Sequence, residues 1–290
     1  MRTMPLPLKP YWRSAVVLFG CVLVLYLIYA SWRQFYPVSA AAGWKVQVYR
    51  DDIAMVSALA LDGRGGLYVS QEISGGKGKI LRLAADGSVS EALTGLSKPD
   101  GQVMFRGGLV TGQEGGALPV LWLRDGKAEA LFEGNNVEGI ATDGQLLYAI
   151  EDARPGRLLR FAPDSGELAV LRAGLDDGEG LGLCADGRLF YTEKRKGWVK
   201  QWQADGPDVL VAEGLNAPGY LQCTAEGLWI TEDATHMARV LLLETTGKLL
   251  TILDHLRSAQ TIIPLSPGSY LLAEQGRSRI LKLSRQAAEG

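Results

Sequence analysis

Residues 137–171, VEGIATDGQLLYAIEDARPGRLLRFAPDSGELAVL, have the pattern of four short β-strands. Turn residues separate the apolar runs, first Asp143-Gly144 and later the PDSG of residues 163–166. Asp-Gly between apolar runs is a strong hairpin signal, because glycine adopts the positive φ that tight turns require. One meander of this kind cannot bury both faces of its sheet, so it needs copies of itself on either side.

The copies are present along the chain. A glutamate that ends the second strand recurs at intervals of 37 to 42 residues. The six glutamates are Glu72, Glu114, Glu151, Glu193, Glu232 and Glu274. A period near forty with four strands per unit is typical of β-propellers. The sequence therefore predicts an all-β fold, a six-bladed β-propeller with four-stranded blades.

The two ends of the predicted propeller complement each other. Residues 44–49, WKVQVY, alternate like a strand before the first meander, whereas the last meander stops after its third strand, residues 279–283. We therefore expect residues 44–49 to form the outermost strand of the final blade and close the ring. The propeller would span residues 44–285, with a tail at 286–290.

The charge distribution separates the first 50 residues from the rest. They contain six of the 30 basic residues and no acidic residue, so the remaining 24 basic and 32 acidic residues carry a net charge of −8. An acidic globular part without a long basic run argues against nucleic acid as a partner.

An apolar segment precedes the propeller. Residues 15–30 include no charged side chain, and Trp12 and Trp32 flank them as in an interfacial aromatic belt. We expect a transmembrane anchor at residues 14–32 and a linker at 33–43. Basic residues within 1–13 favour a cytoplasmic N-terminus.

The predicted location is thus the inner (plasma) membrane, with a single pass and the propeller periplasmic or otherwise outside the cytoplasm. A cleaved signal peptide is the alternative, with VSA at residues 38–40 as its cleavage site. The aromatic and basic residues before that site favour an uncleaved anchor.

Two cysteines fall in the propeller. Cys184 and Cys223 are 39 residues apart, as are Glu193 and Glu232, which suggests equivalent positions in neighbouring blades. Equivalent side chains point in the same rotational sense, so we expect small core residues rather than a disulfide.

The repeated glutamates have candidate basic partners. A lysine or arginine opens the third strand in several units, namely Lys79, Arg157, Arg239 and Arg279. Repetition around the ring favours a structural ion pair over chemistry, because a catalytic group is needed once and not six times.

A second, sparser set of acids precedes the first strands, at the mouth of the channel. Asp100, Glu138 and Glu179 occupy this position in three consecutive blades. Crowded like charges must protonate, find cations or bind a metal, and hard oxygen ligands suit Ca²⁺. We predict Asp100, Glu138 and Glu179 as ligands of a divalent metal, with Ca²⁺ as the expected ion; the alternative is that they only cap exposed loop amides.

Candidate groups for proton transfer are His236 and Asp233, which share a loop on the same face. A single histidine on a polar loop is more often an ordinary surface residue.

The Pro99-Asp100-Gly101 loop and the LYV-type second strands make residues 44–285 similar to the gluconolactonase family, which includes regucalcin. They also resemble the strictosidine synthase-like group, which has a membrane-anchored branch. The resemblance implies a divalent metal in the channel that polarises a lactone carbonyl and activates water, with Asp100, Glu138 and Glu179 as the matching ligands.

Two departures from the family pattern leave other functions open. Residues 55–58, MVSA, replace the family's Glu-Gly-Pro opening, and residues 217–220, APGY, lack its Asn or Asp ligand. The sequence is thus compatible with a lactone or ester hydrolase, a non-catalytic interaction scaffold with a membrane protein partner, or a small-molecule-binding propeller.

Overall fold

The computed structural model describes residues 11–286, which form one helix and a β-propeller. The predicted segments 1–13 and 286–290 lie largely outside the described residues. The chain divides into two units, residues 1–37 and 38–290, which are described separately.

The first unit contains α1 (Tyr11–Phe35), within which the predicted anchor 14–32 falls. Its 25 residues would extend about 37 Å, more than the ~30 Å of a bilayer core. The helix is long and apolar enough to cross a membrane.

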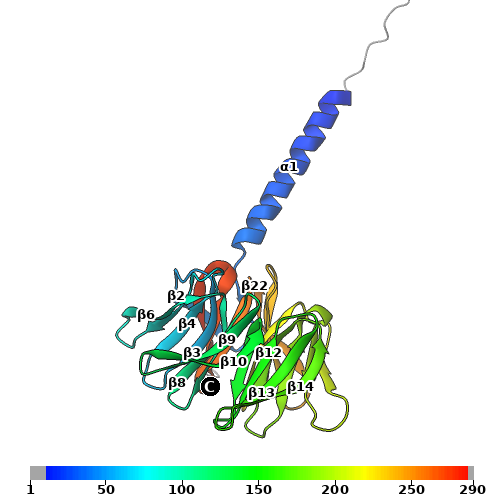
Figure 1. The fold of residues 1–290 in the computed structure, drawn as a ribbon. Helices are drawn as coiled ribbons and strands as arrows, with labels where there is room; N and C mark the ends of the chain where they lie inside the picture. The colour runs from blue at the N-terminus through cyan, green and yellow to red at the C-terminus, as the bar shows by residue number, and fades with distance from the viewer. Residues whose placement is uncertain (1–10, 287–290) are drawn as a thin grey trace, which may run out of the picture. The chain divides into compact units, whose positions relative to one another are not determined.

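The second unit consists of six antiparallel sheets that follow one another in chain order (Figure 1). Blade 1 is β3 (Val56–Leu61), β4 (Leu67–Gln71), β5 (Gly78–Leu83) and β6 (Val89–Leu96). Blade 2 is β7 (Pro99–Phe105), β8 (Gly108–Gln113), β9 (Ala117–Arg124) and β10 (Lys127–Asn135). Blade 3 is β11 (Val137–Thr142), β12 (Leu147–Glu151), β13 (Gly156–Ala162) and β14 (Glu167–Leu175).

Blade 4 is β15 (Gly178–Leu183), β16 (Leu189–Glu193), β17 (Trp198–Gln201) and β18 (Val209–Ala212). Blade 5 is β19 (Pro218–Thr224), β20 (Gly227–Glu232), β21 (Ala238–Glu244) and β22 (Leu249–Leu256). Blade 6 is β23 (Ala259–Ser266), β24 (Ser269–Glu274), β25 (Arg279–Arg285) and, from the start of the unit, β2 (Trp44–Arg50). The six-bladed prediction is confirmed.

The ring closes as the sequence predicted. Strand β2 pairs with β25, with Val46 opposite Leu283. Within the predicted linker, β1 (Ser39–Ala40) also pairs with β22, so residues before β2 cover part of the outer edge of blade 5. The beginning of this unit therefore protects the edges of the two blades that come last in the chain.

The hydrophobic core lies between the blades. Trp229 of blade 5 is fully buried, and its ring lies 4.4 Å from that of Tyr270 in blade 6. Trp44 of β2 packs edge-on against Trp229 at 5.5 Å. The closing strand is thus held by aromatic packing as well as by its backbone hydrogen bonds.

The prediction for the cysteines was wrong, because Cys184 and Cys223 form a disulfide with their Cα atoms 5.1 Å apart. The hairpin between β15 and β16 has three turn residues, whereas that between β19 and β20 has two. Cys223 is therefore equivalent to Leu183, which pairs with Leu189 just as Cys223 pairs with Leu228. Adjacent residues of a strand point to opposite faces, so this offset of one residue turns the two thiols toward each other across the interface between blades.

Candidate functional site at the acidic mouth of the channel

A left-handed residue precedes the inner strand of every blade. Its carbonyl accepts a hydrogen bond of 2.8–3.2 Å from the backbone N–H of the residue that follows the second strand. The six left-handed residues, with φ between 43° and 56°, are Met55, Lys98, Asn136, Asp177, Ala217 and Ser258. Because this unusual conformation recurs with the same hydrogen bond, it places corresponding side chains of all six blades at one end of the channel.

The corresponding residues of the six blades form two rings. The inner ring comes from the starts of the inner strands: Ser57, Asp100, Glu138, Glu179, Gly219 and Gln260. The second ring comes from the residues that follow the second strands: Glu72, Glu114, Asp152, Lys194, Asp233 and Gln275. We call the two rings together the acidic mouth. They contain seven carboxylates.

The register of the repeated glutamates differs from the prediction in two blades. Gln71 and Gln113 pair with the starts of β3 and β7 just as Glu151 pairs with the start of β11. Glu72 and Glu114 are therefore one residue further along and belong to the second ring. A shift of one residue in a strand reverses the direction of the side chain. These two glutamates therefore do not belong with those that form structural ion pairs within their own blade.

The structural role predicted for the other glutamates is confirmed. Glu151 is bound by Arg157 at 2.6 Å, Glu232 by Arg239 at 2.5 Å, and Glu274 by Arg279 at 2.6 Å. Glu193 is bound instead by two lysines of its own blade, Lys196 and Lys200. Lys79 pairs with Glu91 and not with Glu72, contrary to the prediction.

Blades 1 and 2 contribute one group of carboxylates. Oxygens of Glu72, Asp100 and Glu114 lie within 4.8 Å of one another. Lys98 bridges this group, since its Nζ lies 3.0 Å from Glu72 Oε1 and donates to Glu114 Oε2. Asp100 is 1% exposed, and its Oδ1 accepts hydrogen bonds from Ser57 Oγ at 2.8 Å and from the Gly101 N–H.

Blades 2 and 3 contribute a second group that shares Glu114. Oxygens of Glu114, Glu138 and Asp152 also lie within 4.8 Å of one another. Glu114 and Glu138 are only 6% and 7% exposed, and among the described residues Glu114 Oε1 and Glu138 Oε2 have no hydrogen-bond partner. Buried carboxylate oxygens normally have partners, so this convergence fits a hard divalent cation such as Ca²⁺.

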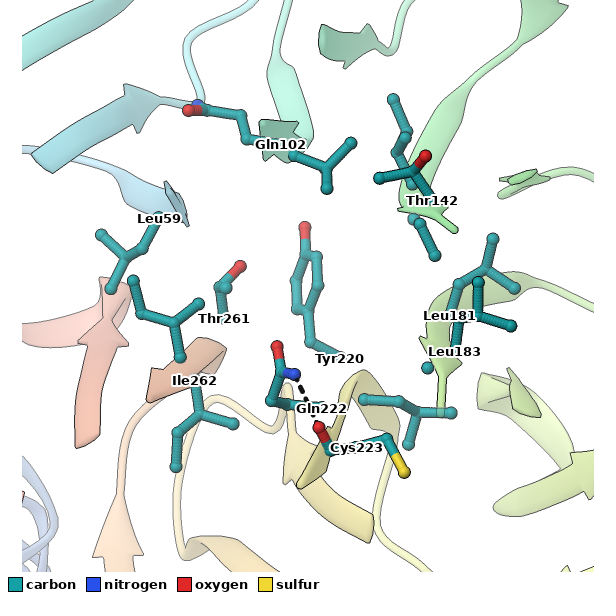
Figure 2. Close-up of a pocket in the computed structure, with 18 residues that line it drawn as sticks. Leu59, Gln102, Thr142, Leu181, Leu183, Tyr220, Gln222, Cys223, Thr261 and Ile262 are labelled. Atoms are coloured by element: carbon teal, nitrogen blue, oxygen red, sulfur yellow. Dashed lines mark hydrogen bonds between the residues drawn. The ribbon is translucent and has the colours of Figure 1, made fainter. Parts of the chain in front are cut away.

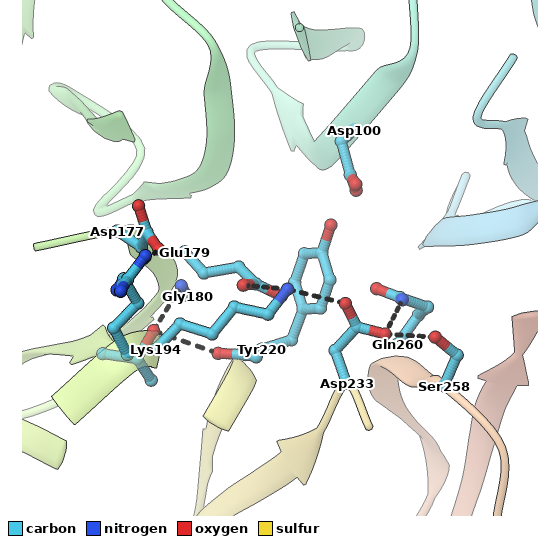
Figure 3. Close-up of polar contacts among 12 residues, drawn as sticks. Asp100, Asp177, Glu179, Gly180, Lys194, Tyr220, Asp233, Ser258 and Gln260 are labelled. Carbon is cyan, nitrogen blue, oxygen red and sulfur yellow. Dashed lines mark hydrogen bonds and ion pairs between the residues drawn. The ribbon is translucent and has the colours of Figure 1, made fainter. Parts of the chain in front are cut away.

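Glu179 has a different environment. Lys194 Nζ lies 2.6 Å from Glu179 Oε2 and 2.7 Å from Asp233 Oδ2, as Figure 3 shows. Asp233 Oδ1 accepts hydrogen bonds from Gln260 Nε2 at 2.7 Å and from Ser258 Oγ. The structure thus divides the three predicted ligands: Asp100 and Glu138 belong to carboxylate groups that share Glu114, whereas Glu179 faces an ammonium.

The predicted proton-transfer residues lie in blade 5. Both carboxylate oxygens of Asp233 are engaged, by Lys194 on one side and by blade 6 on the other. His236 is partly exposed in the loop between β20 and β21. Their catalytic role stays a prediction.

Burial is the main cause of the pKa shifts in the acidic mouth. It raises the pKa of Asp100, Glu138 and Glu179 well above the ordinary values, and neighbouring carboxylates add to the shift. For Glu179 the ammonium of Lys194 acts in the opposite direction. Burial alone would lower the pKa of Lys194, but its carboxylate partners raise it instead. The main causes of the Glu138 pKa shift are burial and neighbouring carboxylates, whereas Lys194 opposes the shift of Glu179 and, together with Lys98, that of Asp152.

Behind the inner ring, the channel contains a cavity of about 150 Å³ (Figure 2). Residues of all six inner strands line it, with aliphatic side chains such as Leu59, Leu181 and Ile262 beside polar ones such as Gln102, Gln222 and Thr261. Tyr220 points into the middle of the view, and its hydroxyl lies 3.4 Å from Ser57 Oγ. Ser57 in turn donates to Asp100, so Tyr220 lies where this cavity meets the acidic mouth.

The fold and this site define a six-bladed propeller with an acidic, cation-deficient channel mouth. No protein-family model matches the chain, and no curated protein matches it in sequence. Among solved structures, the chain is similar to a gluconolactonase from Xanthomonas campestris, with a TM-score of 0.69, 16% identity, and coverage of 84% of this chain and 91% of the other.

Solved structures of other kinds of protein are similar as well. A PQQ-bound aldose sugar dehydrogenase from Streptomyces coelicolor matches with a TM-score of 0.63 and 19% identity, over 85% of this chain and 99% of the other. A chain of a nidogen/laminin complex matches with a TM-score of 0.61 and 15% identity, over 86% and 98%. The chain thus has the six-bladed fold of the gluconolactonase-like proteins, and at these identities the likeness concerns the fold alone.

The sequence alone did not identify Glu72, Glu114 and Asp152 as residues of the candidate site. A usable signal exists, because aligning the second strands LYVSQ and LVTGQ with LYAIE makes Gln71 and Gln113 the equivalents of Glu151. The residue after each of them then falls in one column with Asp152, Lys194 and Asp233. Aligning the six repeated glutamates with one another instead places Glu72 and Glu114 in register with Glu151, so the second ring is not recognised.

Proposed function

We propose that the propeller is a divalent-metal-dependent hydrolase of lactones or related carboxylic esters, with its site at the acidic mouth. The observation that carries the proposal has two parts: Glu114, Glu138 and Asp152 bring carboxylate oxygens within 4.8 Å of one another, and Glu114 Oε1 and Glu138 Oε2 are buried without a described hydrogen-bond partner. The gluconolactonase-like fold supports the substrate class. Glu114, Glu138 and Asp152 would hold the ion, which when bound would polarise the carbonyl and lower the pKa of coordinated water.

The chain's own residues would bind and orient the substrate and move the proton. Asp100 lies beside this set, and burial raises its pKa toward the range useful for a general base. Ser57 and the Gly101 N–H donate to the same oxygen, Oδ1, and so fix the orientation of the carboxyl group. Tyr220 and the residues that line the cavity behind it would bound the site on the other side of the inner ring.

The proposal is tested on the full-length protein in detergent after removal of metal with chelator. We expect one equivalent of Ca²⁺ to rebind, to raise the melting temperature and to restore hydrolysis in a screen of lactones and esters. Glu138→Gln should lose all three effects, while Glu129→Gln, at an exposed position of β10, should retain them. Absence of bound metal and of a thermal shift in the parent protein would refute the hydrolase proposal.

We further propose that α1 anchors the chain in the membrane with the propeller on the oxidising, extracytoplasmic side. The disulfide supports this side independently of the helix, because such bonds persist outside the reducing cytoplasm. In a membrane fraction prepared from cells quenched with a thiol-blocking reagent, Cys184 and Cys223 should resist alkylation until a reductant is added. Alkylation of both before reduction would contradict this topology.

A further inference from the structure

The two carboxylate groups of the acidic mouth share Glu114 but differ in what already occupies them. In the group of blades 2 and 3, Glu114 Oε1 and Glu138 Oε2 have no described partner. In the group of blades 1 and 2, Lys98 takes Glu72 Oε1 and Glu114 Oε2, and Gln275 Nε2 donates to Glu72 Oε2 at 2.6 Å. Glu114 Oε2 is thus paired with an ammonium, whereas Glu114 Oε1 has no described hydrogen-bond partner.

Lys98 reaches this place from the left-handed position of blade 2, with φ of 43°. The corresponding residues of the other blades are methionine, asparagine, aspartate, alanine and serine, none of which carries a positive charge. Its side chain is only about one-third exposed, because the ammonium is directed inward between Glu72 and Glu114. These carboxylates raise the pKa of Lys98 despite its burial, so it stays charged at neutral pH.

We propose that the ammonium of Lys98 takes the place of a second divalent ion and so limits the acidic mouth to one ion, held by Glu114, Glu138 and Asp152. The inference rests on the proposed function, since it assumes that the group of blades 2 and 3 binds an ion. Without the lysine, three carboxylates within 4.8 Å would remain, two glutamates and one aspartate as in the group of blades 2 and 3. A carboxylate can bridge two ions, and Glu114 belongs to both groups.

The test is the number of Ca²⁺ ions bound per full-length chain in detergent, measured by equilibrium dialysis and elemental analysis. We expect one ion for the parent protein and two for Lys98→Met. Because an unpaired acidic group could impair folding, Lys98→Gln serves as a second variant, which keeps a polar side chain without the charge; it should also bind two ions. Combining Lys98→Gln with Glu72→Gln should return the count to one.

Lys79→Met provides the matched control, since Lys79 is an exposed lysine paired with Glu91 away from the acidic mouth, and it should leave the count at one. A count of one in the parent and in both folded Lys98 variants would overturn this inference and leave the hydrolase proposal standing. A count of zero in the parent protein would overturn the proposed function and this inference with it.

Discussion

The two halves of the acidic mouth, blades 1 to 3 and blades 4 to 6, differ in how their buried carboxylates are neutralised. In blades 1 to 3, Lys98 is the one ammonium of the described residues within ion-pair distance of any of the five carboxylates, and two buried oxygens have no described hydrogen-bond partner. In blades 4 to 6, the two carboxylates share Lys194, and neutral Ser258 and Gln260 complete the hydrogen bonds of Asp233. One half therefore has the charge to bind an ion, whereas the other half contains its own cation. Under the proposed function, similar positions in the two rings would serve ion binding on one side and stability on the other.

The largest effect should follow removal of the internal cation. Lys194→Met leaves Glu179, which is 1% exposed, and Asp233 without a counter-charge. Loss of one member of a buried ion pair costs about 3–5 kcal/mol, so we expect the free energy of unfolding to fall by roughly that amount. Chemical denaturation of the full-length protein measures it. Adding Glu179→Gln should recover part of the loss; strictly additive effects of the two substitutions would show that they do not interact.

The disulfide stabilises the same half covalently. Replacing both Cys184 and Cys223 by serine should lower the free energy of unfolding by about 2–4 kcal/mol, because the crosslink restricts the unfolded chain. Ca²⁺ affinity should remain unchanged, since the bond joins blades 4 and 5 and not the proposed ion-binding group. A matched loss of Ca²⁺ affinity would show that the two halves are not independent.

Ion binding itself should distinguish the halves. Glu138→Gln removes a proposed ligand and should weaken Ca²⁺ binding ~100-fold or more, equivalent to about 2.7 kcal/mol. Glu179→Gln, at the same ring position one blade further on, should change the affinity less than ~3-fold, because Lys194 already neutralises Glu179. Calorimetric titration of both variants makes the comparison. Equal losses would mean that the ion is held by all three acids predicted from sequence.

The smallest effect is a pH dependence of stability without metal. Burial raises the pKa of Glu138 above its ordinary value of 4.5, so the folded chain binds more protons than the unfolded chain. The contribution of Glu138 to stability therefore falls as pH rises from about 4.5 through the raised pKa. In chelator, Glu138→Gln should melt higher than the parent by a margin that grows from about pH 5 to about pH 8. A margin independent of pH would contradict the assigned environment.

The sequence alone was sufficient for the architecture of the propeller. The forty-residue period indicated six blades, and the strand-like residues 44–49 opposite an incomplete last meander indicated how the ring closes. The pairing of Glu151 with Arg157 also followed from repetition. Periodicity and alternation are local properties, and burial of both faces of each sheet enforces them along the whole chain.

Only the tertiary structure decided what lies in the channel. Moving Glu72 and Glu114 from the structural set to the second ring depends on a register offset of one residue, as does the meeting of Cys184 with Cys223. A shift of one residue reverses a side chain in a strand, yet it leaves a forty-residue period almost unchanged. The division of charge between Lys98 and Lys194 likewise arises from contacts between blades, where residues distant in sequence determine which carboxylates are neutralised.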